Sequence, residues 1–331
     1  MSALEQHSLR RKRVFVTGGT GLVGGHLIDA LAGEGAEVTA LVRDEVPRSR
    51  FARRRQAEVN VVSGAVENYR LIERALAEYE IEVVFHLAAQ TIVPIAYRAP
   101  IGTFRANIEG TWNVLEACRQ VGHVAAVVVA SSDKAYGSAE RLPYNEDTPL
   151  RAEHPYDVSK ACGDLIARAY WVTYGVPVTI TRCGNIFGPG DLNFSRIIPG
   201  TIRSALLGER PQIRSDGTLI RDYFYVKDAA QAYLMSARAL LASRERMGGE
   251  ALNFSNEQRL TVLEVTKRIL AIMGRADLEP EILAEARAEI AEQSLSAARA
   301  RKLLGWAPRY DFEAGVRETV EFVRQVVEIP G

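Results

Sequence analysis

The first half of the chain alternates short apolar runs with longer segments in which apolar residues recur every three or four positions. Short apolar runs bounded by turn residues are typical of buried strands, and the longer spacing is typical of amphipathic helices. Regular alternation of the two predicts a parallel sheet covered by helices on both faces. We expect strands at residues 14–17, 38–42, 59–62, 83–87, 124–130 and 176–181, and helices at 22–31, 68–77, 103–119 and 156–174.

This alternation ends after about Thr181, where a loop with Gly188-Pro189-Gly190 follows. The remaining chain predicts helices separated by loops, at residues 195–207, 226–241, 261–273, 296–304 and 312–327. The fold class we predict is α/β, a doubly wound parallel sheet with a smaller C-terminal α/β domain. We expect residues 12–183 and about 222–254 in the sheet domain, and residues 184–221 and about 255–328 in the smaller one.

Composition narrows the class of protein. The 331 residues are 47% hydrophobic and 25% charged, as in soluble globular proteins. The 41 basic and 41 acidic residues cancel, which argues against a general nucleic-acid or membrane-surface partner. Three widely spaced cysteines give no disulfide framework and no paired-cysteine metal site, so we expect a cytoplasmic protein without a metal. No apolar run approaches the ~20 residues of a membrane helix, and we expect no signal peptide.

A glycine-rich segment, Thr17-Gly-Gly-Thr-Gly-Leu-Val-Gly24, joins the first expected strand to the first expected helix. In such a turn the first glycine permits a tight bend, the second lets the backbone approach a pyrophosphate, and the third lets helix and strand pack closely. The helix N-terminus adds free N–H groups and a partial positive charge. The segment predicts dinucleotide binding by Gly18, Thr20, Gly21, Leu22, Val23 and Gly24.

The end of the second expected strand bears on the choice between NAD and NADP. An acidic residue there hydrogen-bonds the adenosine ribose, whereas an arginine accommodates a 2′-phosphate. Here Val42 occupies the acidic position, and Arg43 follows it, which favours NADP. Asp44 keeps NAD open. The loop from Arg43 to Arg55 is rich in arginine, and we expect it to be solvated and mobile.

Tyr156 and Lys160 stand four residues apart on an expected helix, which places them on one face. Oxidation of a secondary alcohol needs a base that takes the hydroxyl proton as hydride leaves. Lowering the pKa of a tyrosine from near 10 to around 7 needs about 4 kcal/mol. An ammonium about 4 Å away supplies roughly that at an effective dielectric of 20. The pair therefore predicts a hydride-transfer site, although this spacing alone is also common on surface helices.

The strand expected before that helix ends in Ser131-Ser132-Asp133-Lys134. α/β sheets place their ligands at the carboxyl ends of their strands, and the Ser132 hydroxyl can hydrogen-bond a sugar hydroxyl there. A cluster of this composition is equally consistent with an ordinary turn.

Together these motifs resemble the extended short-chain dehydrogenases/reductases that act on nucleotide sugars. The resemblance implies a Rossmann domain, a small nucleotide-sugar domain, a tightly bound nicotinamide cofactor and a homodimer formed through residues 103–119 and 156–174. It also implies cofactor contacts from Arg43, Leu87, Ala88, Ala89, Gln90, Asn107, Tyr156 and Lys160. The other matching motifs are His86-Leu-Ala-Ala89, Asn107-Ile-Glu-Gly-Thr111, Arg182-Cys-Gly-Asn185, Arg221-Asp-Tyr-Phe-Tyr-Val-Lys-Asp228 and Leu304-Gly-Trp-Ala-Pro308.

Within this family, Ser132-Asp133-Lys134 resembles the segment of CDP-glucose 4,6-dehydratases, and Val42-Arg43 resembles GDP-mannose 4,6-dehydratases. A nucleotide-sugar 4-epimerase, in which Asp133 and Lys134 are only structural, is the alternative. A cofactor-sensing regulator without turnover is a further one, against which the complete set of Ser132, Tyr156 and Lys160 argues.

The mechanism implied for a 4,6-dehydratase begins when Tyr156 takes the C4 hydroxyl proton as hydride leaves C4. Lys134 then removes the C5 proton, Asp133 protonates the departing C6 hydroxyl, and the hydride returns to C6. Asp133 must hold a proton, so its pKa must be raised; burial favours this and a cationic Lys134 opposes it. Relatives usually carry Asp-Glu here, which leaves open whether Lys134, Asp133 or water is the C5 base.

Arg196 and Arg221 are expected to bind the substrate diphosphate, and Asn185 the sugar or phosphate. The alternative for Arg221 is a salt bridge with Asp222 or Asp228. Two positions depart from the family pattern. Gly64 is followed by alanine where relatives often have an adenine-binding aspartate, and Glu292-Gln293-Ser294 stands where relatives often have a phosphate-binding arginine. The base of the nucleotide is left open.

Overall fold

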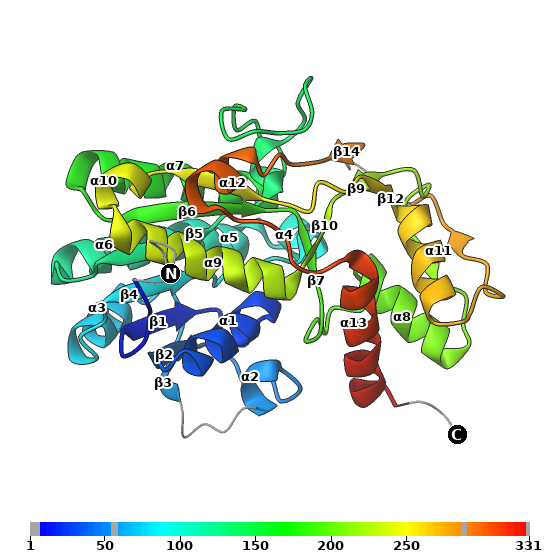
Figure 1. Ribbon diagram of the computed structural model, residues 1–331, viewed down its shortest axis with the longest axis horizontal. Coiled ribbons are helices and arrows are strands. Elements are labelled where there is room, and N and C mark those ends of the chain that lie inside the picture. The colour runs from blue at the N-terminus through cyan, green and yellow to red at the C-terminus, as the bar shows by residue number, and fades with distance from the viewer. Residues whose placement is uncertain (1–6, 54–58, 286–289, 329–331) are drawn as a thin grey trace.

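A seven-stranded sheet forms the larger part of the molecule in the computed structural model, which describes residues 7–53, 59–285 and 290–328 (Figure 1). All six neighbouring pairs in the sheet are parallel, which confirms the predicted doubly wound α/β fold. In spatial order the strands are β11 (Ala251–Phe254), β6 (Val178–Cys183), β5 (Ala126–Ala130), β4 (Val83–His86), β1 (Arg13–Thr17), β2 (Glu37–Val42) and β3 (Val59–Ser63).

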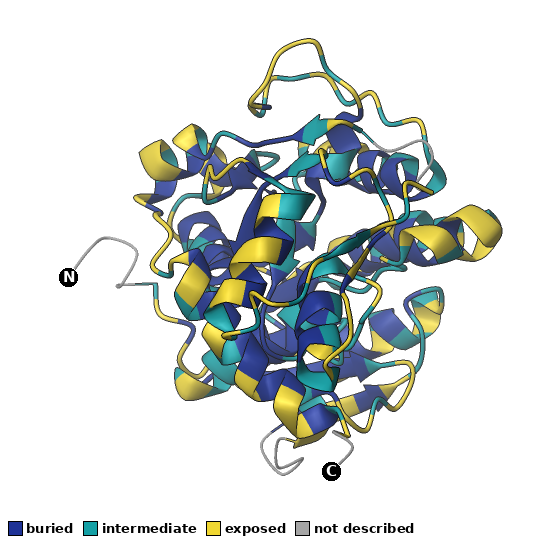
Figure 2. Cartoon of the chain, turned by 90° about the vertical axis from the view of Figure 1, so that its right-hand side faces the viewer, coloured by how far each residue is buried: buried dark blue, intermediate teal, exposed yellow. Residues whose placement is uncertain are grey.

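Helices bury both faces of the sheet, so the central strands alternate between two cores. Val14 and Val16 pack into one core, whereas Phe15 between them packs into the other. The first core is covered by α1 (Leu22–Gly33), α9 (Val226–Ala242), α10 (Arg244–Met247) and α12 (Ala298–Leu304). The second is covered by α3 (Tyr69–Glu78), α6 (Gly110–Val121) and α7 (Pro155–Tyr174). Buried positions accordingly run through the interior, and exposed ones lie on the outer faces of the helices (Figure 2).

The expected helix at residues 103–119 is not a single regular helix. It comprises α5 (Pro100–Phe104), a π-helical turn at Arg105–Glu109, and then α6. Such turns are rare and are often found at functional sites. This one carries the buried Asn107.

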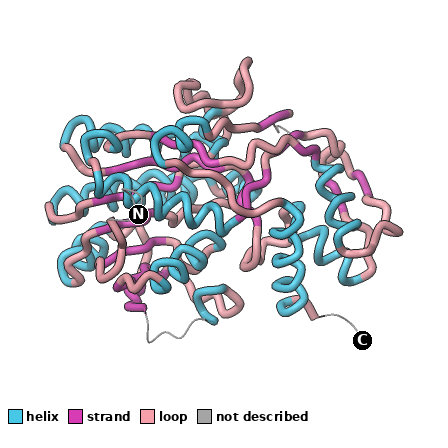
Figure 3. Tube along the Cα trace, in the orientation of Figure 1, coloured by secondary structure: helices cyan, strands magenta, loops and turns pink. Residues whose placement is uncertain are grey.

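The last part of the chain adds helices around a third apolar core, to the right of the sheet in Figures 1 and 3. These helices, α8 (Ile197–Leu207), α11 (Val262–Ile272) and α13 (Phe312–Val326), agree with the sequence-based expectation. The division into two domains at the boundaries given above stays a prediction. Among the described residues, no helix is both long and apolar enough to cross a membrane.

Several short elements were missed, because two to six residues carry little periodicity. Three small sheets formed by such strands join segments far apart in the chain. The strands are β7 (Asn185–Phe187) with β10 (Tyr223–Tyr225), β8 (Gln212–Ile213) with β13 (Glu281–Ile282), and β9 (Ile220–Arg221) between β12 (Leu260–Thr261) and β14 (Glu292–Gln293). The missed helices are α2 (Arg50–Arg53), α4 (Val93–Arg98) and α10, and strand β11 of the large sheet was missed as well.

The arginine-rich loop was expected to be solvated, and its described part is instead docked on two helices. Arg50 pairs with Asp29 of α1, and Arg48 donates a hydrogen bond to the carbonyl of Val326 at 3.2 Å. The Arg53 guanidinium stacks over the Phe322 ring of α13, 5.3 Å from its centroid. Polar partners and an aromatic face therefore fix this loop, which sequence composition alone does not reveal. Arg54 and Arg55 lie outside the described residues.

Candidate active site

A large cleft of about 1890 Å³ lies at the carboxyl ends of the sheet strands. Its walls come from the glycine-rich turn and from the ends of β4, β5 and β6 on one side, and from α8 and β9 on the other. Small-molecule pockets are usually about 300–1,000 Å³. The cleft therefore has room for a dinucleotide and a second ligand of similar size.

The glycine-rich turn has the geometry expected from its spacing. Gly18 has a φ of +76°, and a Cβ there would lie 2.7 Å from the Ala88 nitrogen, so only glycine fits. A Cβ on Gly24 would lie 2.2 Å from the Gly18 carbonyl oxygen, which shows how closely helix α1 packs on the turn. Gly21 caps α1 without any side-chain hydrogen bond, which leaves the helix N-terminus facing the cleft. This cradle suits the phosphates of a dinucleotide.

Most predicted cofactor-binding residues line the cleft, but Gln90 and Asn107 are not among the lining residues. They bind each other instead. The main-chain nitrogen of Gln90 donates to Asn107 Oδ1 at 2.7 Å, and Asn107 Nδ2 donates to the main-chain carbonyl of Gln90 at 3.1 Å. Asn107 Nδ2 also donates to Ser159 Oγ at 2.8 Å, beside Lys160. Because both polar atoms of the Asn107 side chain are already hydrogen-bonded within the protein, these contacts indicate that Asn107 positions the residues of the cleft wall from behind. The predicted residues that do line the cleft are Gly18, Thr20, Gly21, Leu22, Val23, Gly24, Arg43, Leu87, Ala88, Ala89, Tyr156 and Lys160.

A buried hydrogen-bond chain fixes the loop that follows β4. Thr17 Oγ1 accepts hydrogen bonds from the main-chain nitrogens of Leu87 and Ala88, at 3.2 and 3.1 Å. The same hydroxyl lies 2.9 Å from His86 Nδ1, and His86 Nε2 lies 3.1 Å from Thr111 Oγ1. Burial lowers the pKa of His86 to about 3, so this imidazole is neutral and structural.

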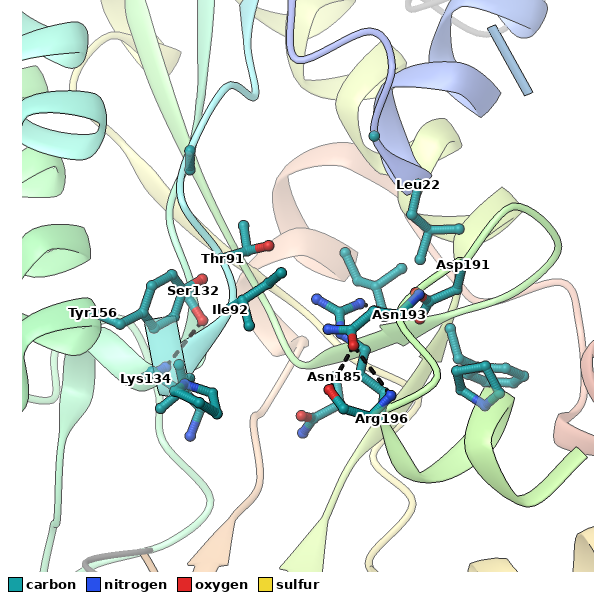
Figure 4. A pocket seen from close by; sticks show the side chains of 18 of the residues that line it. Leu22, Thr91, Ile92, Ser132, Lys134, Tyr156, Asn185, Asp191, Asn193 and Arg196 are labelled. Carbon is teal, nitrogen blue, oxygen red and sulfur yellow. Dashed lines mark hydrogen bonds and ion pairs between the residues drawn. The ribbon is translucent and has the colours of Figure 1, made fainter. Parts of the chain in front are cut away.

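Ser132, Asp133 and Lys134 follow β5 after one intervening residue, and Asp133 begins the 3₁₀-helical segment η3 (Asp133–Tyr136). The Ser132 hydroxyl donates to Asp133 Oδ1 at 3.0 Å and accepts from the Lys134 main-chain nitrogen at 3.3 Å. In Figure 4 Ser132, Lys134 and Tyr156 lie together on one side of the cleft, with Asn185 and Arg196 on the other. The sequence-predicted catalytic residues are thus gathered in one place.

The Asp133 carboxyl is buried, with 4% of the residue exposed. Burial raises its pKa, and the charges of Lys134 and Arg221 oppose this shift, as does its hydrogen bond with Ser132. The direction is the one required of a general acid. Asp157, which also lines the cleft, has its pKa raised by burial too.

Within the chain alone, Lys160 does not produce the acidification of Tyr156 that was expected. Burial raises the pKa of Tyr156 to about 12; the charge of Arg196 is the largest opposing effect, and the hydrogen bond to Ser132 also opposes it. The ammonium of Lys160 is itself buried and donates to the Ala130 carbonyl at 2.8 Å. Burial lowers the pKa of Lys160 to about 8, against the charge of Asp164. Desolvation disfavours the charged form of each group, and this effect outweighs the expected attraction between the Lys160 ammonium and the Tyr156 phenolate.

The three predicted substrate residues, Asn185, Arg196 and Arg221, all line the cleft. Arg196 lies 3.2 Å from Asp191. Arg221 is only 6% exposed and donates to the carbonyl of Ile220 at 2.9 Å. The carboxylates considered as its alternative partners have other contacts. Asp222 accepts from Ser255, and Asp228 accepts from the main-chain nitrogens of residues 309 and 310.

Sequence reasoning missed several basic residues of the far wall, Arg203, Arg210 and Arg214. They lie on α8 and on the segment around β8. Their spacing carries no motif, and only the fold brings them to the cleft.

Known proteins that are similar to this chain agree with a cleft that binds a dinucleotide and a nucleotide sugar. The family model described as "NAD dependent epimerase/dehydratase family" matches residues 14–248. A CDP-glucose 4,6-dehydratase of Salmonella typhimurium is 31% identical, over 96% of this chain and 90% of that protein. A solved UDP-glucose 4-epimerase of Thermotoga maritima with UDP-glucose has a TM-score of 0.87 at 27% identity, covering 96% of this chain and 100% of that one.

A dTDP-glucose 4,6-dehydratase of Streptomyces venezuelae, solved with NAD bound, has a TM-score of 0.85 at 27% identity, covering 95% of this chain and 97% of that one. The resemblance inferred from the motifs is confirmed. The cofactor in that relative is NAD, and a preference for NADP in the present chain stays a prediction.

Proposed function

This chain belongs to the NAD dependent epimerase/dehydratase family, and we propose that it is an NDP-sugar 4,6-dehydratase, a lyase. The observation that carries the proposal is Asp133, a buried carboxyl with a raised pKa in the same cleft as Tyr156. Loss of water from C6 needs an acid that still holds its proton. A 4-epimerase only removes and returns hydride at C4 and has no use for such an acid.

The residues then divide the work as follows. Tyr156, as its phenolate, accepts the C4 hydroxyl proton, with Ser132 hydrogen-bonded to it. The positive charge of an oxidised nicotinamide, when bound, would favour that phenolate. Asp133 donates a proton to the departing C6 hydroxyl, and Lys134 takes the proton from C5 and returns a proton to C5 when hydride adds to C6. The nicotinamide, when bound, supplies the hydride acceptor for C4 and the hydride donor for C6. The product is a 4-keto-6-deoxy sugar, and the cofactor is unchanged over the cycle.

CDP-glucose is the substrate that we propose. The segment Ser132-Asp133-Lys134 and the 31% identity with a CDP-glucose 4,6-dehydratase support it. Val42-Arg43 favours GDP-mannose as the second candidate, and the likeness to a UDP-glucose 4-epimerase keeps the epimerase as the alternative activity. In each case Arg196, Arg221 and Asn185 face the cleft, where guanidinium groups suit a diphosphate.

We also propose that the chain acts as a cytoplasmic homodimer. Large apolar side chains lie exposed on α6 and α7, the helices through which the resemblance implies dimerisation. They are Trp112, Leu165, Val172 and Tyr174. Exposed apolar clusters of this kind mark interaction sites.

The test is incubation with CDP-glucose, GDP-mannose, dTDP-glucose and UDP-glucose, followed by mass spectrometry of the products. A dehydratase gives a product lighter by one water, from CDP-glucose first. A product of unchanged mass but altered sugar configuration would identify the epimerase. Absence of any product from all four would contradict both activities.

A further inference from the structure

Gln293, from a distant part of the sequence, contacts one of the proposed catalytic residues. Its Oε1 accepts a hydrogen bond from Lys134 Nζ at 3.1 Å. The two residues are 159 positions apart in the chain, and Gln293 is 0% exposed. Within the described part of the chain, Gln293 Nε2 has no hydrogen-bond partner. Lys134 is therefore the polar contact that accounts for the orientation of this buried amide.

The strand that carries Gln293 is tied to the segment that carries Lys134. Tyr144 donates from its main-chain nitrogen to the Ser294 carbonyl, and its own carbonyl accepts from the Ser296 nitrogen, both at 2.8 Å. The Tyr144 ring stacks on that of Tyr136, which ends η3, with centroids 4.8 Å apart. Strand β14 also pairs with β9, where Gln293 lies opposite Arg221. These contacts hold Gln293 at a fixed place relative to Lys134.

The amide oxygen of Gln293 is a suitable hydrogen-bond partner for a lysine that must lose and regain a proton. Both the ammonium and the neutral amine can donate to it, because each carries N–H bonds. A carboxylate at the same place would favour the ammonium by its charge. Two carboxyl groups interact with the charge of Lys134: Asp133 on η3 and Asp157 in the first turn of α7. Around these two carboxyl groups lie further charges, His154 near Asp157, and Arg221 of β9 and Asp222 near Asp133. A carboxylate at position 293 would add another negative charge to this group.

We propose that Gln293 is a positioning residue for Lys134, directing its amine toward the reacting sugar through an uncharged oxygen so that the lysine can change its protonation state. The proposal rests on the dehydratase function proposed above. Gln293 itself does not line the cleft, so it acts through Lys134 rather than on the substrate.

The first test compares Gln293→Met and Gln293→Glu with the unaltered enzyme, using CDP-glucose. We expect Gln293→Met to slow water loss roughly tenfold, the effect of losing one hydrogen bond to a charged group, while C4 oxidation in a single turnover is retained. Gln293→Glu should move the pH profile of water loss to higher pH. Glu292→Gln is the matched control, because Glu292 lies beside Gln293 in β14 but pairs with Arg259 instead of Lys134. It should leave the pH profile unchanged.

The second test does not depend on turnover. The chain has only six lysines, so labelling with [ε-¹³C]lysine gives few NMR signals, and Lys134→Arg identifies the relevant one. In Gln293→Glu we expect the Lys134 titration curve to move to higher pH by about one unit. If the Lys134 curve is the same in the unaltered protein, Gln293→Glu and Gln293→Met, the proposal is overturned. If no sugar nucleotide loses water, the dehydratase function is overturned instead. The titration of Lys134 would then still decide the role of Gln293.

Discussion

Lys160 Nζ donates a hydrogen bond of 2.8 Å to the main-chain carbonyl of Ala130, the last residue of strand β5. This bond ties helix α7, which carries Tyr156, to the strand end that Ser132 follows. The ammonium thus fixes the relative position of the Tyr156 and Ser132 hydroxyl groups, which are hydrogen-bonded to each other. Because Lys160 keeps this hydrogen bond when Tyr156 or Asp133 is replaced, such substitutions test proton transfer without removing the contact that joins α7 to β5.

We expect Tyr156→Phe to stop hydride transfer, lowering the rate about 10²–10⁴-fold, because the proton acceptor for the C4 hydroxyl is removed. Formation of the keto product measures this. Tyr79→Phe, at the C-terminal end of α3, is the control and should behave as the unaltered enzyme. Near-normal turnover by Tyr156→Phe would remove this residue from the mechanism.

Asp133→Asn should abolish loss of water and leave part of the C4 oxidation, since an amide cannot donate a proton to the leaving hydroxyl. Reduced nicotinamide absorbance and product mass distinguish the two steps. Asp277→Asn serves as a control, because that carboxylate pairs with Arg275 on the surface. Equal loss of both steps in Asp133→Asn would argue against its role as the acid.

The pH dependence of stability should reveal Asp222. Burial, and the nearby charge of Asp133, raise the pKa of Asp222 to about 8 from 3.8. A raised carboxyl pKa means that the folded protein binds more protons than the unfolded chain between about pH 4 and 8. The contribution of this bound proton to the free energy of unfolding is complete below pH 4 and is lost as the pH rises through 8.

Asp222→Asn should remove this loss of stability at higher pH. From pH 5 to pH 8 the free energy of unfolding of the variant should therefore rise by at least about 1 kcal/mol relative to that of the unaltered protein. Urea unfolding at the two pH values measures it. Identical pH dependence of the two proteins would contradict the raised pKa.

The cofactor preference can be tested at Arg43, whose exposed guanidinium lies 2.6 Å from Asp44 at the edge of the cleft. If the enzyme prefers NADP, Arg43→Ala should weaken NADP binding roughly tenfold and leave NAD binding unchanged. Asp44→Ala is the counterpart, and it should weaken NAD if that carboxylate serves the ribose. Tighter binding of NAD than NADP by the unaltered chain would contradict the preference.

Dimerisation is tested by Leu165→Glu, which places a charge on the exposed apolar face of α7. Leu165 is 58% exposed in the single chain. Burying an unpaired carboxylate at a dimer interface should raise the dimer dissociation constant roughly thirtyfold or more, as measured by analytical ultracentrifugation. Val61→Glu, on the edge strand β3, is the control. A monomeric unaltered chain would refute the homodimer.

The sequence predicts the fold well where periodicity is strong, as in β5 and α7, because hydrophobic spacing depends only on neighbouring residues. It also predicts the tight turn at Gly18 and the close packing at Gly24. It did not predict that Asn107 and Gln90 bind each other, nor that Gln293 meets Lys134. Those contacts join segments distant in the chain and depend on how the elements pack. The acidity of Tyr156 was misjudged for a related reason, since burial is a property of the whole fold.

Tyr156 and Arg196 belong to opposite walls of the cleft, and Arg196 is the largest charge that favours the ionised form of Tyr156. Coulomb attraction weakens with separation. The acid strength of the phenol therefore depends on the width of the cleft. A smaller distance between the two walls strengthens the effect of Arg196 on the phenol, and a larger distance weakens it.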